Sequence, residues 1–142
     1  MSNALDLARL AFELNEVPVG AVIIYEGKII GKGHNSVIGD NDVTSHAEIN
    51  AIRDASKKTG NYRLTNCTMY VTLEPCHMCA KAIVDVRLKS LIYAANEPKT
   101  GSIQSIDKFL DNKFLNHKVL YKSGLFKEES SRLLKDFFSS KR

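Results

Sequence analysis

The chain begins with apolar residues at helical spacing and continues into two runs rich in β-branched residues. The apolar positions from Leu5 to Leu14 predict a first helix. The runs Val17–Tyr25 and Lys28–Gly33 flank Glu26-Gly27 and predict an antiparallel hairpin. Because the first run is apolar on both faces, we expect it to be a central strand with helices on each side.

Helical and strand-like patterns alternate over the rest of the chain. Thr44 or Ser45 is expected to cap a helix that runs to about Lys58, with Gly60 just beyond its end. After it the pattern predicts a strand over Cys67–Leu73, a helix from Cys76 to about Leu88, a strand over Ser90–Ala95, a loop over Asn96–Gln104, a short helix, a strand near Lys118–Tyr121 and a helix over Leu125–Phe138. This alternation predicts an α/β layered sheet, which the opening hairpin makes mixed rather than purely parallel.

Length and composition are those of an ordinary globular protein. The 142 residues fit one domain, and 44% hydrophobic with 25% charged residues is typical of such a domain. No run of about eighteen apolar residues is present, so no membrane partner is expected. The first residues, Met1–Asp6, lack a basic and then apolar secretory pattern, which favours a cytoplasmic location.

The formal charge of +4 lies entirely in the last quarter of the chain. Residues 1–110 carry twelve basic and twelve acidic side chains, whereas residues 111–142 carry eight basic and four acidic ones. A basic end can mark a contact with nucleic acid. On charge alone, a solvated helix face explains it better.

Two short segments about thirty residues apart, His46-Ala-Glu48 and Pro75-Cys-His-Met-Cys79, hold the candidate chemistry. Cys76 and Cys79 are three residues apart at the start of a helix, so both can face one metal ion, and the helix N-terminus favours their thiolate form. Together with His46 they make three zinc ligands, which is the number that leaves a catalytic position open. Glu48 lies two residues from His46 and points differently, as a proton carrier would.

Two other interpretations compete with an open zinc site at these residues. A Cys-x-x-Cys pair can be a thioredoxin-like redox pair, but that leaves His46 and Glu48 without a role. A structural zinc site needs four protein ligands, and His77 is the candidate for the fourth. His77 directly follows Cys76, about 100° further around the helix, so it should face elsewhere. The third cysteine, Cys67, is expected to be a small buried hydrophobic residue.

An open zinc site beside a carboxylate predicts hydrolytic chemistry. Zinc lowers the pKa of water from 15.7 to about 7, and a neighbouring carboxylate can move the proton to a leaving amine. His-x-Glu combined with Pro-Cys-x-x-Cys is the signature of zinc deaminases. We therefore expect loss of ammonia from a ring carbon, with Zn²⁺ as cofactor.

Further segments extend this similarity over nearly the whole chain: Glu16-Val-Pro-Val-Gly-Ala-Val22, Gly33-His-Asn35, His46-Ala-Glu-Ile49, Asn61-Tyr-Arg-Leu64, Tyr70-Val-Thr-Leu-Glu-Pro-Cys76, Lys99-Thr-Gly101, Asn116-His117 and Asp136-Phe-Phe138. In these segments the chain resembles the bacterial tRNA-specific adenosine deaminases, a branch of the cytidine deaminase-like superfamily. The resemblance implies one deaminase domain over residues 1–142, with a three-layer α-β-α fold around a mixed five-stranded sheet. It also implies a homodimer that converts the wobble adenosine of a tRNA anticodon stem-loop to inosine, and the family points to arginine tRNA.

The same resemblance implies roles for individual residues. His46, Cys76 and Cys79 would hold one zinc ion per subunit, and Glu48 would be the general acid and base. Further residues would contact the substrate: Asn35, Val19 and Ala47 around the adenine and its sugar, the backbone of Leu73 and Glu74 beside the attacking water, and Lys99 in a loop that contacts the tRNA. The final helix, with Lys135, Lys141 and Arg142, is also expected to contact the tRNA backbone.

The chain departs from the family pattern at three places: His34, His77 and Ser102-Ile103-Gln104. The last of these replaces a run that usually contains glycine, which affects the expected shape of the substrate loop. Two rival functions stay open on the sequence. One is a deaminase of free guanine or cytosine, and the other is a zinc-stabilised RNA-binding subunit without activity.

Overall fold

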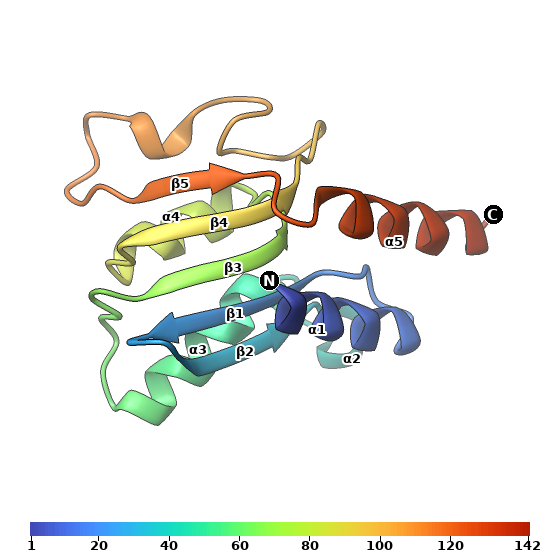
Figure 1. Ribbon diagram of the computed structural model, residues 1–142, viewed down its shortest axis with the longest axis horizontal. Coiled ribbons are helices and arrows are strands. Elements are labelled where there is room, and N and C mark those ends of the chain that lie inside the picture. The colour runs from blue at the N-terminus through green and yellow to red at the C-terminus, as the bar shows by residue number, and fades with distance from the viewer.

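The computed structural model describes residues 1–142 and contains one mixed sheet of five strands (Figure 1). β1 pairs antiparallel with both β2 and β3, whereas β3, β4 and β5 run parallel. The order across the sheet is β2-β1-β3-β4-β5, so β1 is an inner strand, as its apolar pattern predicts. The strands are β1 (Gly20–Tyr25), β2 (Lys28–His34), β3 (Thr68–Leu73), β4 (Ser90–Ala95) and β5 (Leu120–Ser123).

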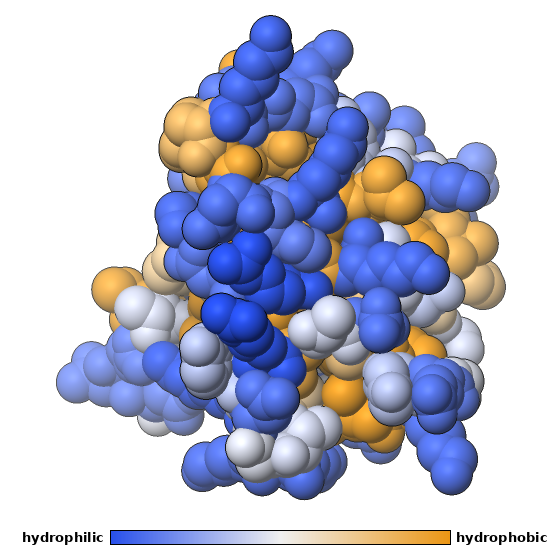
Figure 2. Space-filling model, turned by 90° about the vertical axis from the view of Figure 1, so that its left-hand side faces the viewer, coloured by the Kyte–Doolittle hydropathy of each residue, from blue (hydrophilic) through white to orange (hydrophobic).

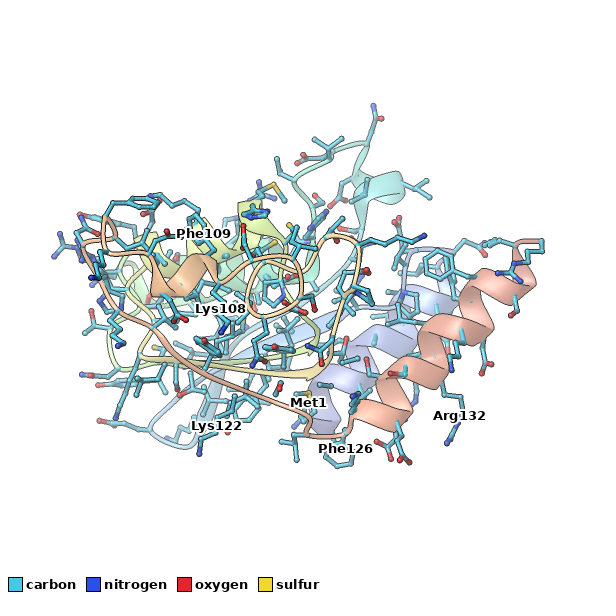
Figure 3. The ribbon with its side chains drawn as sticks, turned by 90° about the horizontal axis from the view of Figure 1, so that it is seen from above. Met1, Lys108, Phe109, Lys122, Phe126 and Arg132 are labelled. Carbon is cyan, nitrogen blue, oxygen red and sulfur yellow. The ribbon has the colours of Figure 1, made fainter.

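Helices cover both faces of this sheet. α1 (Ser2–Glu13) and α5 (Lys127–Ser140) lie on one face, and α3 (Ala47–Thr59) and α4 (His77–Asp85) lie on the other (Figure 1). α1 and α5 run side by side when the molecule is seen from above (Figure 3). The rings of Phe12 and Phe137 lie 5.5 Å apart between these two helices. The expected three-layer α-β-α architecture with a mixed five-stranded sheet is confirmed.

Most element boundaries agree with the sequence pattern to within two or three residues, but the residue expected to cap α3 is wrong. The N-cap is His46, and neither Thr44 nor Ser45 caps this helix. Asp42 Oδ1 accepts hydrogen bonds from both the backbone N–H and the hydroxyl of Thr44, at 2.8 and 2.7 Å. Thr44 is therefore committed to a local turn, and the helix begins two residues later.

The other differences lie where the sequence has no strong local signal. α4 ends at Asp85, three residues before the expected Leu88, because Arg87 adopts a left-handed conformation with φ of 66°. The N–H of Leu88 then bonds to the carbonyl of Ile83, which closes a Schellman motif without a glycine. β5 begins two residues later than expected, and the short helix α2 (Val37–Asp40) was not predicted.

The surface at the end of the sheet that carries the β1–β2 turn is largely hydrophilic, with small apolar patches between polar side chains (Figure 2). The turn is formed by Glu26 and Gly27, and both residues have positive φ, as a two-residue hairpin turn requires. None of the helices combines the length and the apolar character that crossing a membrane would require.

The position of α3 depends on a close approach to β2. An added Cβ at Gly33 would lie only 2.4 Å from both the carbonyl oxygen of Ala47 and the amide nitrogen of Ala51. Both atoms belong to the helix backbone, which cannot turn aside as a flexible side chain can. The absence of a side chain at Gly33 therefore sets how near the start of α3 lies to the sheet.

We predict that Gly33→Ala lowers the free energy of unfolding by about 2 kcal/mol or more, because the new methyl group overpacks a backbone contact. Chemical denaturation followed by circular dichroism measures this change. Lys32→Ala, at an exposed neighbouring position, is the control and should stay within about 0.5 kcal/mol of the parent chain. Equal stability of Gly33→Ala and the parent would contradict the packing described for α3.

Candidate metal centre

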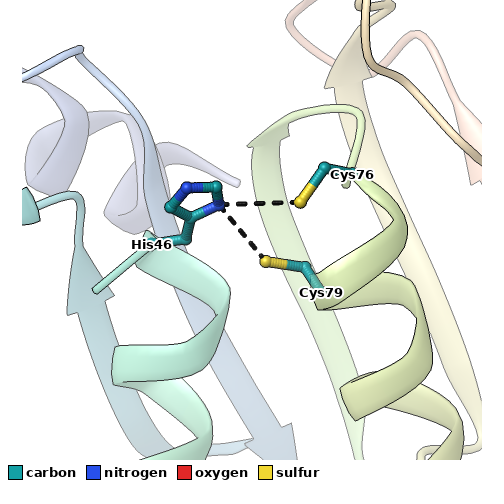
Figure 4. Close-up of side chains that lie close together, drawn as sticks. All are labelled: His46, Cys76 and Cys79. Atoms are coloured by element: carbon teal, nitrogen blue, oxygen red, sulfur yellow. Dashed lines mark hydrogen bonds between the residues drawn. The ribbon is translucent and has the colours of Figure 1, made fainter. Parts of the chain in front are cut away.

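The N-termini of α3 and α4 lie close together and bring three potential metal ligands into contact. His46 is the N-cap of α3, Cys76 is the N-cap of α4, and Cys79 lies in the first turn of α4. His46 Nδ1 lies 3.7 Å from Cys76 Sγ and 3.5 Å from Cys79 Sγ (Figure 4). The ligand atoms of all three side chains lie within 4.8 Å of one another.

This arrangement fits a tetrahedral metal ion. Zinc bonds of roughly 2.0–2.1 Å to nitrogen and about 2.3 Å to sulfur place those atoms about 3.6 Å apart in a tetrahedron, close to both observed separations. No fourth protein ligand completes the group. His77 faces away, as expected, because its Nε2 lies 2.6 Å from Asp107 Oδ2. The three residues could therefore hold a metal ion with one position free.

A hydrogen bond between the two cysteine side chains shifts their pKa values in opposite directions. A hydrogen bond from Cys79 lowers the pKa of Cys76 to about 4, and the same contact, together with burial, raises the pKa of Cys79. A bound cation removes this difference because it stabilises both residues as thiolates. The protein alone thus prepares one thiolate, while the pair is chemically suited to a shared cation.

Glu48 lies in the second position of α3, beside this cluster. Its side chain is only 4% exposed, and burial raises its pKa to about 7. A carboxyl group that changes protonation near neutral pH can both accept and deliver a proton during a reaction. Position and protonation therefore both suit Glu48 to proton transfer.

A cavity of about 730 Å³ opens beside the three potential metal ligands. This volume lies in the range of small-molecule sites, and half of the lining residues are hydrophobic. Most of the residues expected at the site line it: His46, Glu48, Cys76, Asn35, Val19, Ala47, Leu73 and Glu74. Cys79 is fully buried beneath the wall.

Lys99 does not line the cavity. It is exposed in the loop after β4, and the adjacent residue, Thr100, reaches the wall instead. Sequence reasoning also missed Glu16, whose carboxylate accepts the backbone N–H groups of Ile38 and Gly39 at 3.1 and 2.7 Å. Glu16 thereby holds α2 at the rim, a contact across more than twenty residues that no local pattern signals.

The end of α5 also reaches the cavity. Phe137 and Lys141 line it, and Lys141 Nζ donates a hydrogen bond of 2.9 Å to Asn15 Oδ1, which lies just after α1. Arg132, earlier on the same helix, points outward from the body of the molecule (Figure 3). The basic C-terminal segment thus places one positively charged side chain, that of Lys141, at the rim of the cavity.

The side chain of Glu74 is hydrogen-bonded to the loop that follows β4. Its carboxylate accepts hydrogen bonds from residues between Asn96 and Ser105. Burial opposes ionisation, but these donors outweigh it and hold the pKa of Glu74 below its usual range. Glu74 is therefore an ionised, buried residue between the cavity and the loop.

Comparison with known proteins gives a consistent result. A family model described as MafB19-like deaminase matches residues 1–142. The tRNA-specific adenosine deaminase of Haemophilus influenzae is 48% identical over 143 residues, which cover all of this chain and 83% of that protein. A structure from work on A-to-I editing by tRNA A34 deaminases at the wobble position is 43% identical, with a TM-score of 0.92 over 94% of this chain and 97% of that one. A guanine deaminase from Bacillus subtilis is 33% identical, with a TM-score of 0.66 over 99% and 90% of the two chains.

Proposed function

This chain belongs to the MafB19-like deaminase family and, within it, to the tRNA-specific adenosine deaminases. We propose that it deaminates the wobble adenosine of a tRNA anticodon to inosine by hydrolysis. The observation that carries the proposal is the position of a buried carboxyl group, Glu48, beside three metal ligands in one cavity. Full-length identity to tRNA-specific deaminases supports the choice of substrate.

The cofactor in this proposal is one Zn²⁺ per subunit, held by His46, Cys76 and Cys79. Two sulfurs and one imidazole nitrogen are ligands that zinc accepts in catalytic sites with three protein ligands. When bound, zinc acts as a Lewis acid that makes water nucleophilic at neutral pH.

Glu48 moves the proton in this reaction. It accepts a proton from the water that attacks C6 of adenine and delivers it to the departing amino nitrogen, which leaves as ammonia. The oxygen of the water stays on C6, so the product base is hypoxanthine and the nucleoside is inosine. Because Glu48 is buried, its proton is shielded from exchange with bulk solvent during the transfer.

The cavity walls hold the base. Asn35 and the apolar side chains of Val19 and Ala47 surround the adenine and its sugar, while the backbone of Leu73 and Glu74 borders the attacking water. The wobble nucleotide must leave the anticodon stack to enter, which costs a few kcal/mol and least for an unpaired base. An anticodon loop meets that condition.

The partner in this proposal is the anticodon stem-loop of a tRNA, and we propose arginine tRNA, to which the resemblance in sequence points. In this proposal, phosphates around the flipped nucleotide are contacted by Lys99 and Lys141. It is supported by the exposure of Lys99 in its loop and by the position of Lys141 at the rim of the cavity. We further propose that residues 1–142 form one deaminase domain, that two such chains form a homodimer, and that the enzyme works in the cytoplasm, where tRNA is used.

Glu48→Gln should lower kcat on an anticodon stem-loop by about 10²–10⁴-fold, since the amide cannot carry the proton. Zinc content and RNA affinity should stay at the level of the parent chain. Glu13→Gln, on an exposed part of α1, is the charge-matched control and should keep full activity. Unchanged inosine formation by Glu48→Gln would refute the mechanism and favour a subunit whose carboxylate has no catalytic task.

Cys79→Ser should lose most of its zinc, because serine is a poor zinc ligand at neutral pH. Cys67→Ser is the matched control, because Cys67 is equally buried but lies outside the ligand group. Metal analysis of the purified proteins should give about one zinc per chain for the control and the parent. Equal zinc in both variants, or a parent that holds only iron, would contradict the assigned ligands.

Substrate choice separates this function from its nearest rival. The similarity to a guanine deaminase makes a free base the competing substrate. Ammonia release should be measured with an anticodon stem-loop RNA carrying a wobble adenosine, and separately with guanine and cytosine. Release from the RNA alone is expected, and release from a free base alone would overturn the tRNA assignment.

A further inference from the structure

Glu74 lines the cavity, yet its carboxylate takes no part in the proposed chemistry. It is 3% exposed and directly follows β3, two residues before Cys76. A buried carboxylate is costly unless hydrogen bonds replace its lost hydration. The groups that replace this hydration show what the residue does.

The donors to Glu74 all belong to one segment, the loop after β4. Oε2 accepts three consecutive backbone N–H groups, from Ile103, Gln104 and Ser105, at 3.0, 2.7 and 2.9 Å. Oε1 accepts the N–H of Glu97 at 3.0 Å and the hydroxyl of Ser105. One side chain therefore holds both ends of the loop 97–105.

The backbone of the loop packs closely against this carboxylate. An added Cβ at Gly101 would lie 2.4 Å from Cδ and 2.5 Å from Oε1 of Glu74. The following residue, Ser102, donates its backbone N–H and its hydroxyl to the carbonyl of Pro75, at 2.9 and 3.1 Å. The loop is thus fastened to two successive residues just before Cys76.

This loop forms one wall of the cavity. Thr100 lines the cavity, and the backbone N–H of Lys99 donates to Glu97 Oε1 at 2.9 Å, which shapes the tip of the loop. The bonds from residues 103–105 to Glu74 Oε2 come from main-chain groups, so the Ser102-Ile103-Gln104 sequence keeps them without glycine. These three bonds therefore depend on the acceptor at Glu74 and not on the identity of the side chains at positions 103–105.

We propose that Glu74 is the positioning residue for the substrate wall. Its carboxylate holds the 97–105 loop in the conformation that places Thr100 and Lys99 beside the entering nucleotide. The proposal rests on the proposed function for the identity of the substrate. That the carboxylate of Glu74 fixes the conformation of the loop does not depend on that function.

The test compares Glu74→Gln with Glu13→Gln, which removes the same charge from an exposed position on α1. A glutamine side chain presents an amide nitrogen to one set of donors, so at least one backbone N–H loses its acceptor. Amide hydrogen exchange should accelerate about tenfold or more within the loop 97–105 and not elsewhere in the chain. The KM for the anticodon stem-loop should rise about tenfold, with kcat within about twofold and zinc content unchanged.

Gly101→Ala is a second, independent variant. Its added methyl group would clash with the carboxylate of Glu74 and so disturb the same contact from the loop. Its exchange pattern and its rise in KM should match those of Glu74→Gln. The double variant should be little worse than the worse single variant, because both changes break one interaction. If Glu74→Gln fails to fold, Gly101→Ala still decides the proposal by the same two readouts.

Two results would overturn the proposal. One is unchanged exchange in the 97–105 loop of both variants. The other is a fall in kcat or zinc content with KM unaltered, which would place the effect of Glu74 on the metal centre. An inactive parent chain would refute the proposed function, whereas the exchange measurement would still decide whether Glu74 holds the loop.

Discussion

The site depends on the approach of two helix N-termini to one point. α3 comes after β2 and the short helix α2, and α4 follows β3; the strand order brings the starts of α3 and α4 to the same end of the sheet. Gly33 lets α3 lie against β2 closely enough for His46 to face the two cysteines of α4. Both helix ends carry partial positive charge, which favours thiolates at this point. The ligand group therefore follows from how the helices are docked, and any change in that docking changes the ligand separations.

The cavity is assembled around this fixed point from segments that are remote in sequence. β1 supplies one wall through the residues just before it, the loop after β4 supplies another through Thr100, and the end of α5 brings Lys141 to the rim. α2 also lines the cavity, and buried carboxylates hold both α2 and the loop after β4: Glu16 binds the backbone of α2, and Glu74 binds the loop 97–105. In the proposed function the chemistry lies at the starts of α3 and α4, and the substrate contacts lie on segments that acidic side chains hold in place. Of the basic C-terminal segment, Lys141 lines the cavity.

The sequence predicted the parts of this structure that local patterns encode. Apolar periodicity placed the five strands, and the three-residue spacing of Cys76 and Cys79 correctly indicated that both face one point. The errors arose where a distant or unusual interaction decides. Thr44 is bound by Asp42 and so does not cap α3, and Arg87 ends α4 in a conformation for which glycine is the usual signal. The roles of Glu16 and Glu74 could not be inferred, because their hydrogen-bond partners lie more than twenty residues away.

The central claim is that this chain deaminates the wobble adenosine of tRNA. Its most direct test is inosine mapping by sequencing of total tRNA from cells with the active protein and from cells depleted of it. The account predicts inosine at the first anticodon position of an adenosine-bearing tRNA only where the protein is active, with adenosine in its place after depletion. Inosine at the same level in both samples, or adenosine at that position in both, would contradict the claim.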